Sequence, residues 1–110
     1  MRNIDSLKNT SEFKEVYEKG QSAANGLIVL YALATDKDEQ KLGISVSKKV
    51  GNSVVRHRLS RVIRASFVEL CKELPTGYRF VVVARKRAVE KNFSDICDAL
   101  RYLSKKMKLD

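Results

Sequence analysis

Residues 42–64 read LGISVSKKVGNSVVRHRLSRVIR, and along them the spacing of apolar side chains changes from every second residue to every third or fourth. Leu42, Ile44 and Val46 alternate with small or polar residues, as in a strand with one buried face. From residue 53 onward the apolar side chains fall on one side of a helix. The stretch therefore predicts a β-strand that leads through a short basic loop into an amphipathic helix.

The predicted helix carries arginines on the side away from its apolar face. At ~100° per residue, Arg58, Arg61 and Arg64 fall opposite the apolar arc, whereas Arg56 lies near its edge in the first turns. Arginine suits phosphate because its planar guanidinium can make two parallel hydrogen bonds to the oxygens. The loop before the helix adds two lysines and a glycine next to the helix N-terminus, where free N–H groups attract anions.

Charge is distributed unevenly along the chain. Its 110 residues contain 22 Lys and Arg against 13 Asp and Glu, a formal net charge of +9. Residues 40–68 hold seven of the basic side chains and no acidic one. Because local ion pairs cannot neutralise such a segment, a polyanionic partner is favoured, with nucleic acid ahead of an anionic membrane surface. A merely solvated helix face is the alternative interpretation.

The remaining elements are predicted from capping residues and apolar periodicity. Asn9 and Glu12 form a capping pair before a first helix, and the last helix starts at Asn92 or Ser94. In chain order the elements are a helix up to Gly20, an extra short strand near 21–24, a strand over 27–34, the strand and helix of residues 42–74, a strand over 78–84 and the last helix. We therefore expect a single α+β domain over residues 1–110, without linkers or repeats.

Membrane and secreted classes are disfavoured. The longest apolar run, residues 27–34, is much shorter than the roughly 20 residues of a membrane-spanning helix, and the first residues lack the apolar region of a secretory signal. Cys71 and Cys97 are too far apart for a CxxC motif, and buried free thiols are favoured over a disulfide. We expect a cytoplasmic protein with no membrane partner.

Side chains for catalysis are scarce in this sequence. His57 is the only histidine, and it lies inside the arginine run. No metal-ligand spacing, nucleophile elbow or phosphate-binding loop is present. We therefore expect neither a catalytic residue nor a metal site in the protein itself.

Two smaller groups of residues have a structural and a functional interpretation. Phe13 and Tyr17 are four residues apart in the first helix, and Tyr31 shares a strand face with Val29. Aromatic rings near cations can stack on unpaired bases, but rings at helical spacing usually face a core, which the spacing favours here. Residues 85–87, Arg-Lys-Arg, form a second basic cluster at a strand end, which could equally be ordinary solvated surface.

In combination, these residues resemble the protein subunit of bacterial ribonuclease P over nearly the whole chain. The resemblance rests on Leu7-Lys8, Phe13, Val16-Tyr17, Gly20, Leu30-Tyr31, the block from Gly43 to Asn52, Val55 to Arg58, Arg61, Ile63-Arg64 and Ala84 to Lys86. It implies an α-β-β-β-α-β-α sandwich similar to a ribosomal-protein domain. It also implies that the arginine helix lies in a left-handed β-α-β crossover, which the general handedness rule would not predict.

The resemblance further implies an accessory subunit of an endoribonuclease that removes the 5′ leader of precursor tRNA. The RNA subunit would perform the Mg²⁺-dependent hydrolysis, with the metal held by that RNA and the substrate. The protein would bind the RNA subunit, one protein per RNA, and the single-stranded leader. The alternative is a non-catalytic RNA-binding or ribosome-associated protein, and a protein-only nuclease using His57 is the least favoured class.

Site residues follow from the resemblance by position. Contacts to the RNA subunit are implied for Lys48, Lys49, Asn52, Arg56, Arg58, Arg61 and Arg64. A cleft for the leader is implied for Phe13, Tyr17, Val29, Tyr31 and His57. The second basic cluster consists of Arg85, Lys86 and Arg87.

The sequence departs from the family pattern at three positions. His57 replaces an Asn between two arginines, Ser60 stands where a basic residue is frequent, and Arg87 stands where Pro is usual. The preference of the family for particular leader bases therefore need not apply to this chain.

Overall fold

Strands and helices are mixed along the chain in the computed structural model, which describes residues 4–109. The elements are β1 (Asp5–Ser6), α1 (Thr10–Lys19), β2 (Gln21–Ala24), β3 (Ile28–Ala34), β4 (Gln40–Ser45), α2 (Ser53–Leu70), η1 (Cys71–Glu73), β5 (Tyr78–Ala84), η2 (Lys86–Glu90) and α3 (Phe93–Lys106), where η marks a 3₁₀ helix. The expected single domain also includes residues 1–3 and 110, which lie outside the described residues.

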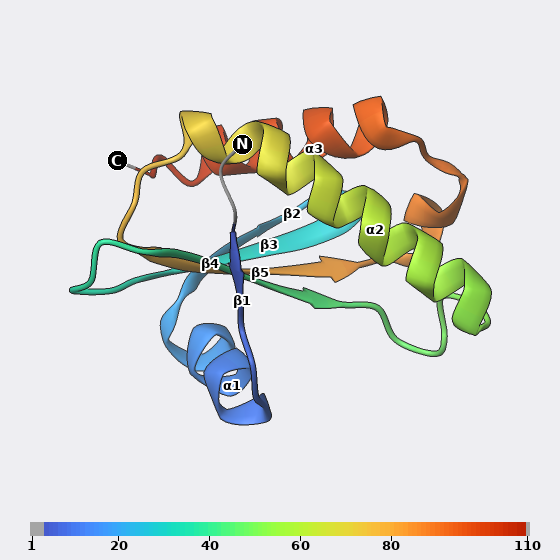
Figure 1. Cartoon of the computed structure of the whole chain (residues 1–110). Helices are drawn as coiled ribbons and strands as arrows, with labels where there is room; N and C mark the ends of the chain where they lie inside the picture. Colours follow the sequence, from blue (N-terminus) through green and yellow to red (C-terminus); the bar gives the residue numbers. More distant parts are fainter. Residues whose placement is uncertain (1–3, 110) are drawn as a thin grey trace.

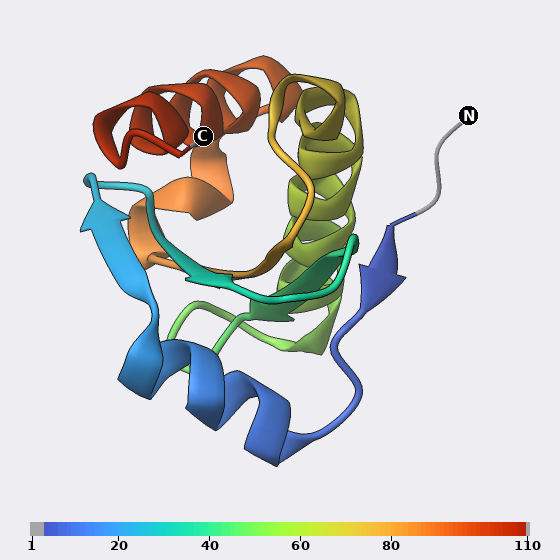
Figure 2. The ribbon, with the colours of Figure 1, turned by 90° about the vertical axis from the view of Figure 1, so that its left-hand side faces the viewer.

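The strands form one mixed sheet in the order β1-β4-β5-β3-β2. β4 runs parallel to both β1 and β5, whereas β3 runs antiparallel to β5 and β2. Helices α2 and α3 cover one face of this sheet, and α1 crosses the other face (Figures 1 and 2). The sheet therefore has helices on both faces (Figure 2), and the protein is an α+β sandwich, as the sequence resemblance implied.

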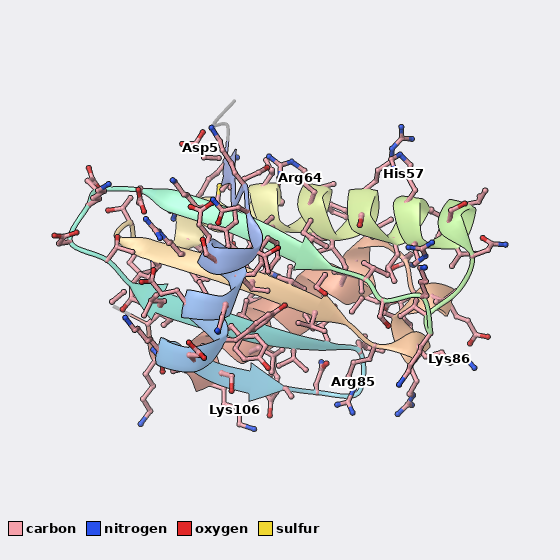
Figure 3. The ribbon with its side chains drawn as sticks, turned by 90° about the horizontal axis from the view of Figure 1, so that it is seen from below. Asp5, His57, Arg64, Arg85, Lys86 and Lys106 are labelled. Atoms are coloured by element: carbon pink, nitrogen blue, oxygen red, sulfur yellow. The ribbon has the colours of Figure 1, made fainter. Side chains whose placement is uncertain are left out.

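The β4–α2–β5 connection is left-handed. β4 and β5 are parallel neighbours, and with the α2 layer toward the viewer and the strands pointing up, β5 lies to the left of β4 (Figures 1 and 3). About 98% of such crossovers are right-handed, so this connection is a rare arrangement. Its consequence is that α2 packs over the β4 side of the sheet, with its N-terminal turns next to the loop that follows β4.

Two apolar cores lie on the two faces of the sheet. The larger core lies between the sheet and the α2–α3 layer, and its fully buried side chains include Ile28, Leu30, Leu42, Leu59, Ile63, Phe67, Phe80, Ile96, Leu100 and Leu103. The smaller core, under α1, has only Leu7, Val16 and Val81 as buried members. α1 is therefore attached to the sheet by much less apolar contact than α2 and α3.

Side-chain caps define the helix starts that the sequence predicted. The Asn9 side chain accepts a hydrogen bond from the Glu12 N–H, and the Asn52 side chain accepts one from the Val55 N–H. Asn92 and Asp95 form a complete capping box at the start of α3, so Asn92 is the cap. Gly20 ends α1, where an added Cβ would lie 2.6 Å from the Val16 carbonyl oxygen.

Three features differ from the expectations. The helix predicted over 53–74 is α-helical only to Leu70 and continues as η1, because Leu74 precedes Pro75 and is extended. Phe93 is largely exposed, although its spacing fits the apolar face of α3. The two-residue strand β1 was not expected, since so short a segment carries no periodicity.

Other expectations agree with the structure. The short strand near 21–24 is β2, and the strand over 78–84 is β5. Cys71 and Cys97 are both free and buried. None of the helices found between residues 4 and 109 has the length and apolar character needed to span a bilayer.

Candidate nucleic-acid interface

Helix α2 presents two chemically distinct faces. Leu59, Ile63 and Phe67 are fully buried against the sheet and α3. Arg58 and Arg61 are exposed on the outer side, as are Lys48 and Lys49 in the preceding loop. Within residues 4–109, the Arg61 guanidinium makes no hydrogen bond or ion pair with another residue, so it can take an external partner.

The other arginines of α2 also contact the protein itself. Arg56 Nε donates to the Gly51 carbonyl at 3.2 Å, and Arg58 Nη1 donates to the Val89 carbonyl at 3.3 Å. The first bond holds Arg56 to the loop before α2, and the second holds Arg58 to η2. Each guanidinium has five N–H groups, so donors remain for a ligand.

Arg64 has a structural role that its position in the motif did not reveal. Its Nη2 donates to the Ile4 carbonyl at 2.7 Å and its Nη1 to the Ser6 hydroxyl at 3.1 Å. These contacts tie β1, at the edge of the sheet, to α2. Because the partners are about 60 residues away in sequence, no local pattern could have indicated them.

The two basic clusters come together at one end of the sheet, where β4 and β5 finish. β4 and β5 are parallel, so the loop with Lys48 and Lys49 and the segment with Arg85 and Lys86 both leave from their carboxyl ends. A surface pocket lined by Val50, Lys86, Arg87, Val89 and Glu90 joins the loop to η2. Figure 3 shows Arg85 and Lys86 at the end of the sheet and His57 on α2.

Four of the expected cleft residues meet on the α1 face of the sheet. The Tyr17 and Tyr31 rings are edge to face with centroids 4.9 Å apart, and Phe13 lies 6.4 Å from Tyr17. Tyr17 is 38% exposed, whereas Phe13, Val29 and Tyr31 are half-buried. Half-burial leaves the open side of these rings available for stacking.

Phe13 is seated on the backbone of β4. An added Cβ at Gly43 would lie 2.6 Å from Phe13 Cζ, and the nearest Leu7 carbon would be 2.9 Å away. Gly43 therefore leaves the space that the Phe13 ring fills. Phe13 would therefore form part of the floor of the implied cleft, and the Tyr17–Tyr31 pair would face its open side.

The sheet register aligns two further residues with Val29 that sequence analysis did not single out. Val29 pairs with Val83, and Val83 pairs with Ser45, so the three side chains form one row across β3, β5 and β4. Val83 and Ser45 are half-buried, like Val29. Alternation along each strand indicated the face, but only the pairing of strands could show which residues share the row.

The expected position of His57 in this cleft is wrong. Its side chain is exposed on α2, on the opposite face of the sheet from α1, where it lines a groove with Ile44, Val46, Arg56 and Ser60. Even-numbered side chains of β4 point to α2, whereas the cleft uses the opposite face. His57 therefore belongs to the basic surface of α2.

Ion pairs hold the flank of α1 that faces away from the cleft. Arg79 on β5 contacts Glu39 at 3.0 Å and Glu15 at 3.3 Å, and Lys41 contacts Glu12 at 3.8 Å. The pKa of Arg79 is raised, chiefly by its hydrogen bond to Glu39. The pKa of Glu12 is held below its ordinary value, chiefly by a hydrogen bond from the Lys8 backbone N–H.

Magnesium is the metal that the resemblance implies, held by the RNA subunit and the substrate. Magnesium prefers oxygen ligands, commonly carboxylates together with water and phosphate. In the part of the chain that the structure describes, no three His, Cys, Asp or Glu side chains gather closely enough to hold a metal ion.

The fold and these surfaces define an α+β protein of the nucleic-acid-binding class. A family model described as Ribonuclease P matches residues 1–108. The ribonuclease P protein component of Lachnoclostridium phytofermentans is 47% identical over 105 residues, covering 96% of this chain and 90% of the relative. That of Bacillus mycoides is 41% identical over 109 residues, covering 96% and 93%. The chain therefore belongs to the ribonuclease P protein family.

Solved structures agree with this assignment. The RNase P protein of Staphylococcus aureus aligns with a TM-score of 0.83 and 33% identity, over 97% of this chain and 98% of that one. The RNase P protein of Thermotoga maritima aligns with a TM-score of 0.81 and 26% identity, over 94% and 97%. The chain is thus the protein subunit of a Mg²⁺-dependent endoribonuclease that processes tRNA, and its partner is ribonuclease P RNA.

Proposed function

We propose that the basic surface binds the RNA subunit of ribonuclease P and that the aromatic cleft binds the single-stranded 5′ leader of precursor tRNA. The observation that carries this proposal is that basic side chains leave the sheet together at the carboxyl ends of β4 and β5, while a half-buried aromatic group lies on the α1 face of the same sheet. Double-helical RNA is contacted mainly through phosphates, whereas single strands also use stacking. Two surfaces of different chemistry therefore suit two different RNA segments.

The basic surface consists of Lys48, Lys49, Asn52, Arg56, Arg58, Arg61 and Arg64, with Arg85, Lys86 and Arg87 as an extension. Within this set Arg58 and Arg61 make the main phosphate contacts, because both are exposed. Arg64 contributes less directly, since two of its nitrogens already bind β1.

The chain acts as one RNA-binding domain over residues 1–110, with one protein per RNA, in the cytoplasm. Magnesium supplies the phosphodiester hydrolysis and is held by the RNA subunit and the substrate. The protein lowers the electrostatic cost of bringing two polyanions together and adds contacts to the leader. Both effects are binding effects, which is consistent with a subunit that needs no catalytic side chain.

The proposal is tested by cleavage of a precursor tRNA by bacterial ribonuclease P RNA, with and without the protein. Because protein cations replace magnesium in screening RNA–RNA repulsion, we expect the Mg²⁺ concentration for half-maximal cleavage to fall by about tenfold. The same Mg²⁺ requirement with and without protein would contradict the proposed mechanism. Cleavage by the protein without RNA, abolished by His57→Ala, would instead indicate a protein-only nuclease.

The cleft separates the proposed function from a general RNA-binding or ribosome-associated role. Stacking is worth about 1–3 kcal/mol per base, so Tyr17→Ala should weaken holoenzyme binding of precursor tRNA about fivefold or more. Binding of mature tRNA should not change. Tyr102→Ala is a matched control, since Tyr102 is a 58% exposed tyrosine on α3. Equal losses for precursor and mature tRNA would rule out a leader-specific cleft.

A further inference from the structure

Helix α1 has different chemistry on its two flanks. Val16 is fully buried and faces the sheet. At ~100° per residue, Phe13 and Tyr17 lie to one side of Val16, and Glu12 and Glu15 lie to the other. The aromatic flank forms a wall of the cleft, and the acidic flank forms the ion pairs with the sheet.

The apolar contacts of α1 do not fix its rotation by themselves. Val16 is the one fully buried side chain among the residues of the helix, and the core beneath it is small. The other apolar contacts of α1, made by Phe13 and Tyr17, lie on the aromatic flank. A rotation of the helix that lifts this flank would carry Tyr17 away from Tyr31. Contacts on the opposite flank are needed to resist it.

Arg79 supplies the central contact on that flank. It is at the middle of the sheet, paired in register with Leu33 of β3 and Lys41 of β4. Its guanidinium bridges Glu39 and Glu15, which joins the β3–β4 loop to α1. The Arg79 and Glu39 side chains are only 18% and 15% exposed, so solvent screens this contact less than a surface ion pair.

We propose that Arg79 is a positioning residue for leader binding, which holds the acidic flank of α1 to the sheet and thereby keeps Tyr17 opposite Tyr31. This inference rests on the proposed function of the cleft. Arg79 itself does not touch the leader, because α1 lies between it and the open side of the cleft. Its effect on RNA is transmitted through Tyr17.

The first experiment compares Arg79→Met with Arg101→Met in the reconstituted holoenzyme. Arg101 is a matched control, since it also contacts two carboxylates, Glu73 at 3.2 Å and Asp98 at 3.7 Å, but lies in the α3 layer. We expect Arg79→Met to lower the ratio of precursor to mature tRNA affinity by about 3- to 10-fold, within the range of coupled neighbours. Arg101→Met should leave this ratio unchanged, and affinity for ribonuclease P RNA should be unaffected in both.

A double variant tests whether Arg79 acts through Tyr17. If it does, adding Arg79→Met to Tyr17→Ala should cause little further loss of the affinity ratio. Fully additive losses, or an unchanged ratio for Arg79→Met while Tyr17→Ala lowers it, would overturn the positioning role and leave the proposed cleft intact. No effect of either substitution would overturn both.

Glu15→Gln keeps the test decisive if Arg79→Met fails to fold. It removes the Glu15 carboxylate, which contacts Arg79 and also Lys19 at 3.8 Å, and leaves the Arg79–Glu39 pair in place. Glu15 is 42% exposed, so folding should be little affected. We expect the affinity ratio to fall by about 2- to 5-fold, in the same direction as for Arg79→Met. An unchanged ratio in folded Glu15→Gln holoenzyme would overturn the inference.

Discussion

Replacing Arg58 and Arg61 together by alanine is expected to weaken binding of ribonuclease P RNA by about 10- to 100-fold, because two exposed phosphate contacts are lost. Each neutralised phosphate releases counterions, so the slope of log affinity against log salt should become shallower by roughly 1.5. Both side chains are exposed on the outer face of α2, and the thermal stability of the free protein should change little. Binding measured at three or more salt concentrations checks the affinity and the slope.

The control must remove the same charge from another surface. Lys105 and Lys106 are exposed in the last turn of α3, so their double alanine variant lowers the net charge equally. If the lysine variant lost as much affinity as the arginine variant, binding would depend on net charge and not on the α2 surface. An unchanged salt slope in the arginine variant would also contradict phosphate contact by these two residues.

The opposite face of the same helix should behave differently. Ile63→Ala is expected to lower the free energy of unfolding by about 2–5 kcal/mol, since it removes apolar atoms from a closely packed core and leaves a cavity. Ile63 is fully buried between the sheet and the α2–α3 layer. A loss of this size is a large part of the roughly 5–15 kcal/mol that stabilises a domain. Denaturant unfolding of the free protein measures it.

Val54→Ala is the matched control on α2. Val54 is also β-branched, but it is 76% exposed, so its truncation should change stability by no more than about 0.5 kcal/mol. A loss below about 1 kcal/mol for Ile63→Ala would mean that α2 does not bury this face. If the folded Ile63→Ala protein keeps its RNA affinity, the two faces of α2 act independently.

Local features of the fold could be predicted because their causes lie within a few residues. The Asn9 cap, the alternation of β4 and the apolar arc of α2 are all visible in short windows of sequence. For α3 the sequence predicts a cap at Asn92 or Ser94, and the structure shows that Asn92 is the cap, in a capping box with Asp95. The left-handed crossover came only from the resemblance, since the general rule predicts the other hand.

The candidate site was predicted in part. The arginines of α2 could be singled out because a run of arginines without acid is visible in sequence, whereas the spacing of the aromatic residues favoured a core and only the resemblance implied a cleft. His57 was placed with the aromatic residues, but it lies on the other face of the sheet. Val83 and Ser45 were missed, because an apolar strand residue and a small polar one carry no functional signal until the register aligns them with Val29.

The sequence by itself determined most of the elements, though not the short strand β1, together with the basic and apolar faces of α2 and the absence of acid from residues 40–68. Only the tertiary structure decided which faces meet. Arg64 reaches Ile4 across 60 residues, and Arg79 reaches Glu15 across 64. Helix and strand formation depends on neighbours a few residues apart, whereas such contacts depend on strand order and register, which many distant side chains fix together.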